Sequence, residues 1–203
     1  MFKPLYALLA FFREKLLLLI GGTLGLSPDT LTYAGFLISL VSAWLYTRGS
    51  FVAAAFVLLA SVLCDVFDGL VAKRYDKTTA FGSLLDSCVD RYIEVFQFAG
   101  IFFYFNANGR PSFAYIALFY ILGSFLTSYT RAKIESLGYP CKVGRVQRLE
   151  RMFSLIVLSL FAALDSRILF WGLLAVGVGS NYTALERLVY GKRILKNTSL
   201  EKR

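Results

Sequence analysis

The sequence predicts an all-α polytopic membrane protein with six transmembrane helices and an N-terminal interfacial helix. Hydrophobic residues make up 57% of the 203-residue chain, and the mean hydropathy is +0.62. Apolar stretches recur along its length, each near the roughly 20 residues that a helix needs to cross a bilayer. After these spans, the chain has no room for a large soluble domain. The stretches lie at about 29–48, 51–73, 81–106, 112–133, 150–166 and 168–190.

Residues 1–25 predict a juxtamembrane helix and not a signal peptide. Arg13, Glu14 and Lys15 interrupt the apolar run and leave it too short for a signal-peptide core. A helix of this kind lies in the membrane interface. The membrane domain then covers 26–191, and 192–203 form a basic tail.

The distribution of basic residues predicts that both termini face the cytoplasm. Of the 22 Lys and Arg residues, 18 lie in the terminal segments and in the two loops on the same side as the termini. Only Arg48, Arg110 and Arg167 lie in the opposite loops. Because cytoplasmic loops carry the excess of Lys and Arg, we expect a cell-membrane protein with a cytoplasmic active site. The net charge of +9 then faces anionic membrane lipids and substrate, and not nucleic acid.

Four aspartates occur inside the second and third predicted spans: Asp65, Asp68, Asp86 and Asp90. An aspartate at the centre of a membrane helix costs about 2.5 to 3.5 kcal/mol, so four without compensation would cost on the order of 10 kcal/mol. Divalent metal ions neutralise carboxylates that lie together. The sequence therefore predicts a metal site within the membrane domain.

Helical geometry brings these aspartates onto two faces that meet across a helical hairpin. At about 100° per residue, Asp65 and Asp68 share one face of their helix, and Asp86 and Asp90 share one face of the next. Hard oxygen ligands in this number suit Mg²⁺ or Mn²⁺, and a pair of such ions suits phosphoryl transfer. Small residues on the same faces leave room for a ligand beside the backbone: Gly69, Ala72 and Gly82.

The stretch from Asp65 to Asp90 resembles the signature of the CDP-alcohol phosphotransferase family. That signature reads D-x-x-D-G-x-x-A-R-x(8)-G-x-x-x-D-x-x-x-D, and seven of its eight fixed positions match here with every gap length kept. The departure is Lys73, which keeps the charge of the usual arginine but lacks its planar fork for a diphosphate. The resemblance implies a membrane enzyme that transfers a phosphatidyl-type group from a CDP-lipid to a polar alcohol and releases CMP. The lipid is CDP-diacylglycerol or its ether analogue.

The resemblance also implies roles for the aspartates. Asp65, Asp68 and Asp86 match the family's primary metal ligands, for two Mg²⁺ or Mn²⁺ ions per site. Asp90 matches a position that is both a ligand of the second metal and the base that takes the proton of the acceptor hydroxyl. The family forms homodimers through its membrane helices, so a homodimer is implied too.

A loop before the first span is similar to the family's Ser-Pro-Asn-x-x-Thr element, which helps to bind the nucleotide. Its Pro28 is typical of a helix start. Asp29 stands in place of the asparagine and lacks the amide donor. The residues predicted to bind the CDP-lipid are Pro28, Asp29, Thr30, Leu31, Thr32, Gly69, Ala72, Lys73, Thr79 and Gly82.

A second group of residues points to the acceptor, because several cations beside a metal–diphosphate site suit an alcohol that itself carries phosphate. The run from Ser128 to Lys133, with an arginine twenty residues after Arg131, resembles the inositol-phosphate pocket of phosphatidylinositol-phosphate synthases and their archaeal counterparts. Glycerol 3-phosphate is the alternative acceptor. Another interpretation is that these cations only follow the excess of basic residues on the cytoplasmic side. The residues predicted to bind the acceptor are Arg131, Lys133, Arg148, Arg151 and Arg187.

The remaining reactive residues add little chemistry. The chain has no histidine, which excludes histidine acid–base catalysis and histidine metal sites. Cys64, Cys88 and Cys141 lack the spacing of a zinc site or of a disulfide framework, so we expect buried thiols. Arg91 and Glu94 are predicted to form an ion pair that faces a neighbouring helix or a second subunit.

Two other classes of protein place aspartates in membranes. Prenyltransferases also bind a magnesium diphosphate, but their aspartates lie on helices far apart in sequence, whereas one hairpin carries all four here. A divalent-cation transporter uses carboxylates to line a permeation path. Only the transferase predicts release of CMP that requires both a CDP-lipid and a polar alcohol.

Overall fold

The computed structural model describes residues 14–15, 21–22 and 25–201, and the side chains of that range up to 196. Within these residues the chain is all helical, and most of the predicted interfacial helix at 1–25 lies outside them. The bounds follow the predicted apolar stretches closely, except that the helix of the fifth stretch ends five residues early and the last helix runs on into the predicted tail. The helices are α2 (Pro28–Thr47), α3 (Phe51–Arg74), α4 (Ala80–Ala107), α5 (Pro111–Ser136), α6 (Arg148–Phe161) and α7 (Ser166–Glu201).

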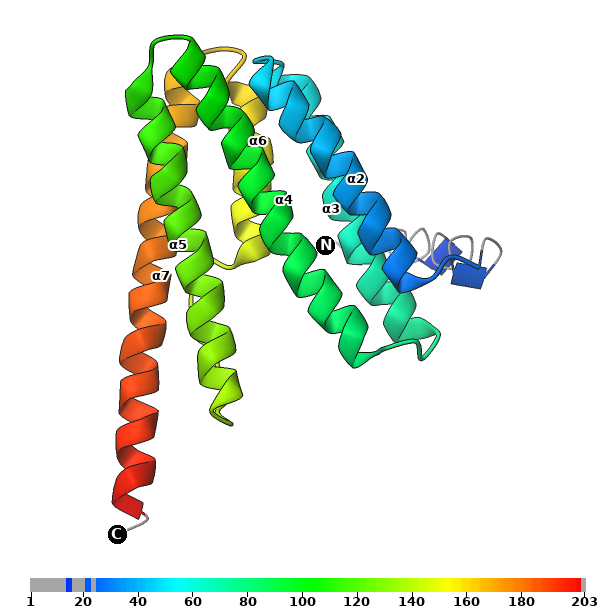
Figure 1. The fold of residues 1–203 in the computed structure, drawn as a ribbon, viewed down its shortest axis with the longest axis vertical. Helices are drawn as coiled ribbons and strands as arrows, with labels where there is room; N and C mark the ends of the chain where they lie inside the picture. The colour runs from blue at the N-terminus through cyan, green and yellow to red at the C-terminus, as the bar shows by residue number, and fades with distance from the viewer. Residues whose placement is uncertain (1–13, 16–20, 23–24, 202–203) are drawn as a thin grey trace, which may run out of the picture.

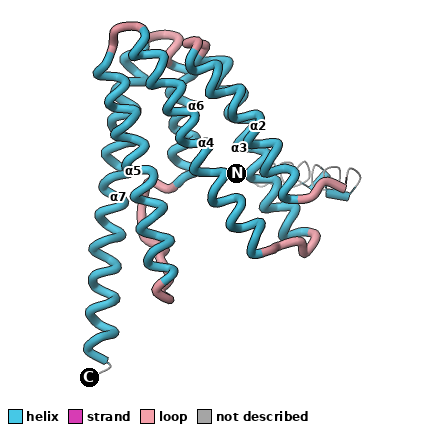
Figure 2. The backbone as a smooth tube through the Cα atoms, viewed as in Figure 1, coloured by secondary structure: helices cyan, strands magenta, loops and turns pink. Residues whose placement is uncertain are grey.

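The helices form two groups that meet at one end of the molecule (Figure 1). In the first group α2 packs against α3 and α4, and in the second α5 packs against α7. Helix α4 also contacts α5, and the short α6 touches both α3 and α7. Most connections are tight, but the segment from 137 to 147, between α5 and α6, is longer and has no helix of its own (Figure 2).

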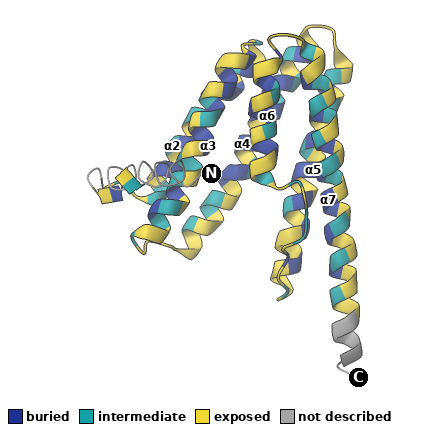
Figure 3. Cartoon of the chain, turned by 180° about the vertical axis from the view of Figure 1, so that it is seen from behind, coloured by how far each residue is buried: buried dark blue, intermediate teal, exposed yellow. Residues whose placement is uncertain are grey.

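Among the described residues, four helices are long and apolar enough to cross a membrane: α2, α3, α5 and α7. Helix α4 has the length but carries Asp86, Asp90, Arg91 and Glu94. Helix α6 has only 14 residues, which span about 21 Å and fall short of the hydrocarbon core. Large apolar side chains such as Trp44, Phe56 and Trp171 are more than half exposed on the outer faces. Such faces suit lipid, and exposed residues cover the outward sides of the helices (Figure 3). Polar side chains such as Ser42 and Gln97 are buried.

Helix α2 begins at the residues that the sequence predicts as a helix start. Pro28 lies in the first turn, and the hydroxyl of Ser27 accepts a hydrogen bond from the Thr30 backbone N–H at 3.2 Å. This confirms the predicted helix start. Helix α4 begins in the same way, because the Thr79 hydroxyl accepts from the Gly82 N–H at 2.8 Å. The capped ends of α2 and α4 are the ends that lie nearer to the aspartates.

One prediction about the cysteines is wrong. All three are free, but only Cys141 is buried; Cys64 is half-buried and Cys88 is exposed. Cys88 lies two residues before Asp90, about 200° around α4 from it. It therefore falls on the outer face of the helix when the aspartate points inward.

Close packing of α2 against α4 depends on Gly100. A Cβ atom at this position would lie 2.5 Å from the Ala43 carbonyl oxygen and 2.9 Å from the Tyr46 Cβ. Next to it, Gln97 is fully buried and donates to the Ser39 carbonyl at 2.9 Å, while it accepts from the Ser42 hydroxyl at 2.9 Å. The small residue thus lets α2 approach until this polar network closes.

Replacing Gly100 with alanine should therefore destabilise the protein by about 1 to 3 kcal/mol, because α2 has to move away from α4. The control is Gly69→Ala on α3, since a Cβ there would meet no atom within 4 Å. Alanine in an open helical position costs no stability. Thermal unfolding in detergent measures both variants, and equal melting temperatures would contradict the close approach.

Candidate active site

Three carboxylates come together where α3 faces α4. Asp65 and Asp68 from α3 and Asp86 from α4 each offer an oxygen atom, and these atoms lie within 4.8 Å of one another. Oxygen ligands on opposite sides of one Mg²⁺ ion are about 4.2 Å apart, so a small side-chain rotation suffices for all three to bind it. The donor set therefore fits a hard divalent cation.

Thr32 supports this triad from a third helix. Its hydroxyl donates to Asp68 Oδ2 at 2.6 Å, and both side chains are buried. The bond holds the Asp68 carboxylate next to the carboxylates of Asp65 and Asp86. The sequence predicts that Thr32 contacts the nucleotide, and in the structure its hydroxyl contacts a metal-site carboxylate.

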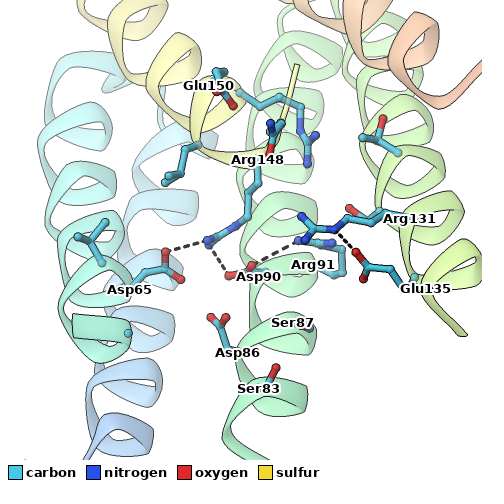
Figure 4. A pocket seen from close by; sticks show the side chains of 18 of the residues that line it. Asp65, Ser83, Asp86, Ser87, Asp90, Arg91, Arg131, Glu135, Arg148 and Glu150 are labelled. Carbon is cyan, nitrogen blue, oxygen red and sulfur yellow. Dashed lines mark hydrogen bonds and ion pairs between the residues drawn. The ribbon is translucent and has the colours of Figure 1, made fainter. Parts of the chain in front are cut away.

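Asp90 lies apart from the triad and pairs with an arginine. Arg148, at the start of α6, places Nη2 2.5 Å from Asp90 Oδ1 and Nη1 2.8 Å from Asp65 Oδ2 (Figure 4). The prediction assigned Arg148 to the acceptor, but here it compensates two of the four aspartates. No local sequence pattern indicates this contact, because Arg148 lies 83 residues after Asp65 and 58 after Asp90.

These side chains border a cavity of about 700 Å³ that opens between the two helix groups. One wall is acidic and comes from α3 and α4, and the other is basic and comes from α5, α6 and α7. The charged side chains of the two walls meet in the same space (Figure 4). The predicted site residues that line the cavity are Asp65, Gly69, Lys73, Asp86, Asp90, Arg131, Arg148, Arg151 and Arg187.

Other predicted residues do not line this cavity. Lys133 is exposed and lies about 200° around α5 from Arg131, so the structure does not bring it to the acceptor group. The CDP-lipid residues outside the lining gather near the starts of α2 and α4, where a Cβ on Gly82 would lie 3.2 Å from Asp29 Oδ1. They are Pro28, Asp29, Thr30, Leu31, Thr32, Ala72, Thr79 and Gly82.

Arg151, which is predicted to bind the acceptor, is held by Glu94. Arg151 is 1% exposed and donates through Nε and Nη2 to Glu94 Oε1, at 3.0 and 2.8 Å. Ser124 on α5 donates to the other carboxylate oxygen. The predicted pair of Arg91 with Glu94 is present as well, but only at 3.8 Å. One buried carboxylate thus ties α4, α5 and α6 together behind the cavity.

Arg187 on α7 is held by backbone carbonyls. It is 3% exposed, and it donates to the Val143 oxygen at 2.8 Å and to the Thr127 oxygen. Gly144 in the loop before α6 has a φ of 125°, and a Cβ there would lie 3.1 Å from Arg187 Nε. Arg187 therefore fastens this loop to α7 while its guanidinium lines the cavity.

Comparison with known proteins agrees with this geometry. Residues 25–179 match the CDP-alcohol phosphatidyltransferase family, which is most of the chain. The chain belongs to this family. It is an enzyme of phospholipid biosynthesis, a membrane-embedded transferase that depends on a divalent cation, for which the aspartate triad offers the ligands.

The relatives include enzymes from archaea and bacteria. The archaetidylinositol phosphate synthase of Methanothermobacter thermautotrophicus is 34% identical over 87% of this chain and 89% of the relative. The phosphatidylinositol phosphate synthase of Streptomyces avermitilis is 32% identical over 83% of this chain and 73% of the relative.

Solved structures of the phosphatidylinositol phosphate synthase of Mycobacterium tuberculosis have the same fold. The structure with CDP-DAG bound superposes with a TM-score of 0.76 at 28% identity, over 83% of this chain and 88% of that one. The complex with manganese and citrate gives 0.77 at 27% identity, over 83% and 84%.

The contact of Thr32 with Asp68 yields a first prediction for the site. In Thr32→Val the carboxylate loses the bond that orients it, so the affinity for Mn²⁺ should fall by about 10- to 100-fold. Thr32→Ser keeps the hydroxyl and should bind Mn²⁺ nearly as well as the native protein. Electron paramagnetic resonance titration of free Mn²⁺ measures both. Native affinity in Thr32→Val would show that the hydroxyl does not organise the triad.

The buried Glu94–Arg151 pair yields a second prediction. Glu94→Gln leaves the buried Arg151 charge uncompensated, which should lower the free energy of unfolding by about 3 to 5 kcal/mol. The matched control is Glu135→Gln, which breaks the exposed pair of Arg131 with Glu135 and should cost at most about 1 kcal/mol. Denaturant unfolding in detergent compares the two, and equal losses would contradict the assigned role of Glu94.

Proposed function

We propose that this enzyme transfers a phosphatidyl-type group from a CDP-lipid to inositol phosphate and releases CMP. The observation that carries the proposal is the single cavity in which a triad of carboxylates faces a wall of arginines. A CDP-lipid brings a diphosphate for metal ions bound to the triad. The arginines on the opposite wall suit a second anion, which is the phosphate of the acceptor.

The names of the relatives favour inositol phosphate over other phosphorylated alcohols. Two enzymes that each match more than four fifths of this chain are an archaetidylinositol phosphate synthase and a phosphatidylinositol phosphate synthase. A structural neighbour binds CDP-DAG, which supports the CDP-lipid donor. Glycerol 3-phosphate stays the second candidate, because its phosphate presents the same charge to the arginines.

We assign each part of the reaction to residues of the cavity. When bound, two Mg²⁺ or Mn²⁺ ions would offset the diphosphate charge. Lys73 contributes a further positive charge to the diphosphate from the end of α3. Asp90 accepts the proton of the acceptor hydroxyl. At the same time the hydroxyl oxygen of the acceptor bonds to the phosphorus that carries the lipid. The bond from that phosphorus to the bridging oxygen breaks, and CMP leaves with the electron pair.

The remaining predicted contacts divide into residues that bind the donor and residues that bind the acceptor. The starts of α2 and α4, from Pro28 to Thr32 and from Thr79 to Gly82, hold the nucleotide, and Gly69 and Ala72 let the donor approach α3. Arg131, Arg148, Arg151 and Arg187 form the acceptor side. Arg148 then has a double role, because it also compensates Asp65 and Asp90.

The proposal includes the arrangement in the membrane. The domain at 26–191 contains six spans. Helix α4 crosses because its charged groups turn towards α3, α5 and α6, and the short α6 crosses together with the residues that follow it, as in the predicted stretch 150–166. Both termini, the tail at 192–203 and the cavity face the cytoplasm, as the distribution of basic residues predicts. Two copies form a homodimer in contact with membrane lipids, as expected for the family.

An acceptor panel tests the function. Purified protein with Mg²⁺ and CDP-diacylglycerol, or its ether analogue, should release CMP with inositol phosphate, and more slowly with glycerol 3-phosphate. Inositol, serine and choline should be poor acceptors, because none of them carries a phosphate for the arginines to bind. Chromatographic measurement of CMP compares the rates.

The outcomes separate the alternatives. Faster release with glycerol 3-phosphate would assign the second candidate. An unphosphorylated alcohol that exceeds both would show that the arginines serve topology and not the acceptor. CMP release that needs no alcohol at all would contradict the transfer reaction, and uptake of Mn²⁺ into vesicles without CMP release would favour a cation transporter.

A further inference from the structure

We propose that Arg91 is a further substrate-binding residue, which holds the phosphate of the acceptor beside Asp90; this rests on the proposed function above. Arg91 is predicted from sequence only to pair with Glu94. In the structure it lines the cavity between the aspartates and the basic wall. Its guanidinium is the least firmly held among the cavity arginines of the described chain.

The other arginines of the cavity each make at least one short bond within the protein. Glu135, Asp65, Glu94 and the Val143 carbonyl hold them at 2.8 to 2.9 Å. These partners hold four guanidinium groups before any substrate binds. In the same order, the guanidinium groups are those of Arg131, Arg148, Arg151 and Arg187.

Arg91 has no bond of this quality in the described residues. Its Nη2 lies 3.4 Å from Asp90 Oδ2, and its Nε lies 3.8 Å from Glu94 Oε2. The Nε atom is buried and has no hydrogen-bond partner in the described part of the chain. A guanidinium carries five N–H donors, so most of those on Arg91 remain for a ligand.

The reason for these long contacts is competition for Glu94. Arg151 takes one carboxylate oxygen of Glu94 twice, and Ser124 takes the other. Arg91 is left beside a carboxylate whose oxygens are already used. Its side chain is 24% exposed, whereas that of Glu94 is 1% exposed, so the cavity is the open side for the arginine.

The surroundings of Arg91 indicate which anion it binds. In Figure 4 the side chains of Arg91 and Arg131 extend towards the same part of the cavity, from α4 and from α5. Two guanidinium groups that share a space are stabilised by an anion that both contact, and a phosphate monoester offers oxygens to each. The donor residues Gly69 and Lys73 line the cavity from α3, on the other side of the aspartates.

The sequence position of Arg91 gives the contact a consequence for the reaction. Asp90 precedes it directly and is the proposed base. A phosphate held by Arg91 keeps the rest of the acceptor near Asp90, where a hydroxyl can lose its proton. Arg91 thus selects a phosphorylated alcohol and orients it. An unphosphorylated alcohol lacks the group that Arg91 binds, so it is not oriented in this way.

Steady-state kinetics of Arg91→Gln test the contact, with CMP release from CDP-diacylglycerol as the measurement. The KM for inositol phosphate should rise about tenfold or more, as expected when a charge-assisted bond to phosphate is lost. The KM for CDP-diacylglycerol should change less than about twofold. The preference for inositol phosphate over inositol, as a ratio of kcat/KM values, should fall by the same factor as the acceptor affinity.

Two further variants make the test specific. Arg91→Lys keeps the charge without the fork and should give an intermediate KM; it also replaces Arg91→Gln if that variant does not fold. Arg167→Gln removes one exposed positive charge at the first turn of α7, outside the cavity, and should behave as the native protein.

The results distinguish this contact from the function on which it rests. Native enzyme that does not use inositol phosphate or glycerol 3-phosphate overturns both. Native enzyme that uses them, with an unchanged acceptor KM in Arg91→Gln and Arg91→Lys, overturns only the role of Arg91. An equal rise in both substrate KM values also overturns it, because the residue would then support the cavity as a whole.

Discussion

Negative charge between α3 and α4 has to be met by positive charge before these helices can pack in a membrane. Four aspartates lie within these two helices, and the structure compensates them in two ways. Three form a triad that fits a divalent cation, and Arg148 from α6 bridges Asp65 and Asp90. Because α6 supplies that arginine, the position of the shortest helix depends on the same charges as the chemistry.

A second buried carboxylate, Glu94, determines how the arginines of the basic wall are held. Glu94 lies one turn after Asp90, and it fixes Arg151 on α6 and Ser124 on α5. The same carboxylate leaves Arg91 with only long contacts. A buried acid that touches no substrate therefore decides which arginine is rigid and which is available for an anion.

Much of this fold could be predicted from the sequence. The apolar stretches gave the helices to within a few residues for most of them, because each span needs a fixed length of apolar chain. Spacing also brought Asp65 and Asp68 onto one face, since neighbours one turn apart on a helix share a side. Errors occurred where apolar length was the only guide, as at the early end of α6.

Contacts between helices distant in sequence could not be predicted. Arg148 reaches Asp65 across 83 residues, and Arg151 reaches Glu94 across 57. No local pattern encodes either pair, so both arginines were assigned to the acceptor alone. The exposure of Cys88 could not be predicted for a related reason, because the side of a helix that faces the site depends on neighbours that the sequence does not reveal. The position of Lys133 outside the cavity lining has the same cause.

The most direct test of this account is the thermal stability of the native protein in detergent as Mn²⁺ or Mg²⁺ is added. If the cation offsets the charge of the triad, the melting temperature should rise with metal concentration, by an amount that corresponds to about 2.7 kcal/mol at one hundred times the dissociation constant. The rise should be absent in Asp86→Asn. A melting temperature of the native protein that does not respond to either ion would contradict the account.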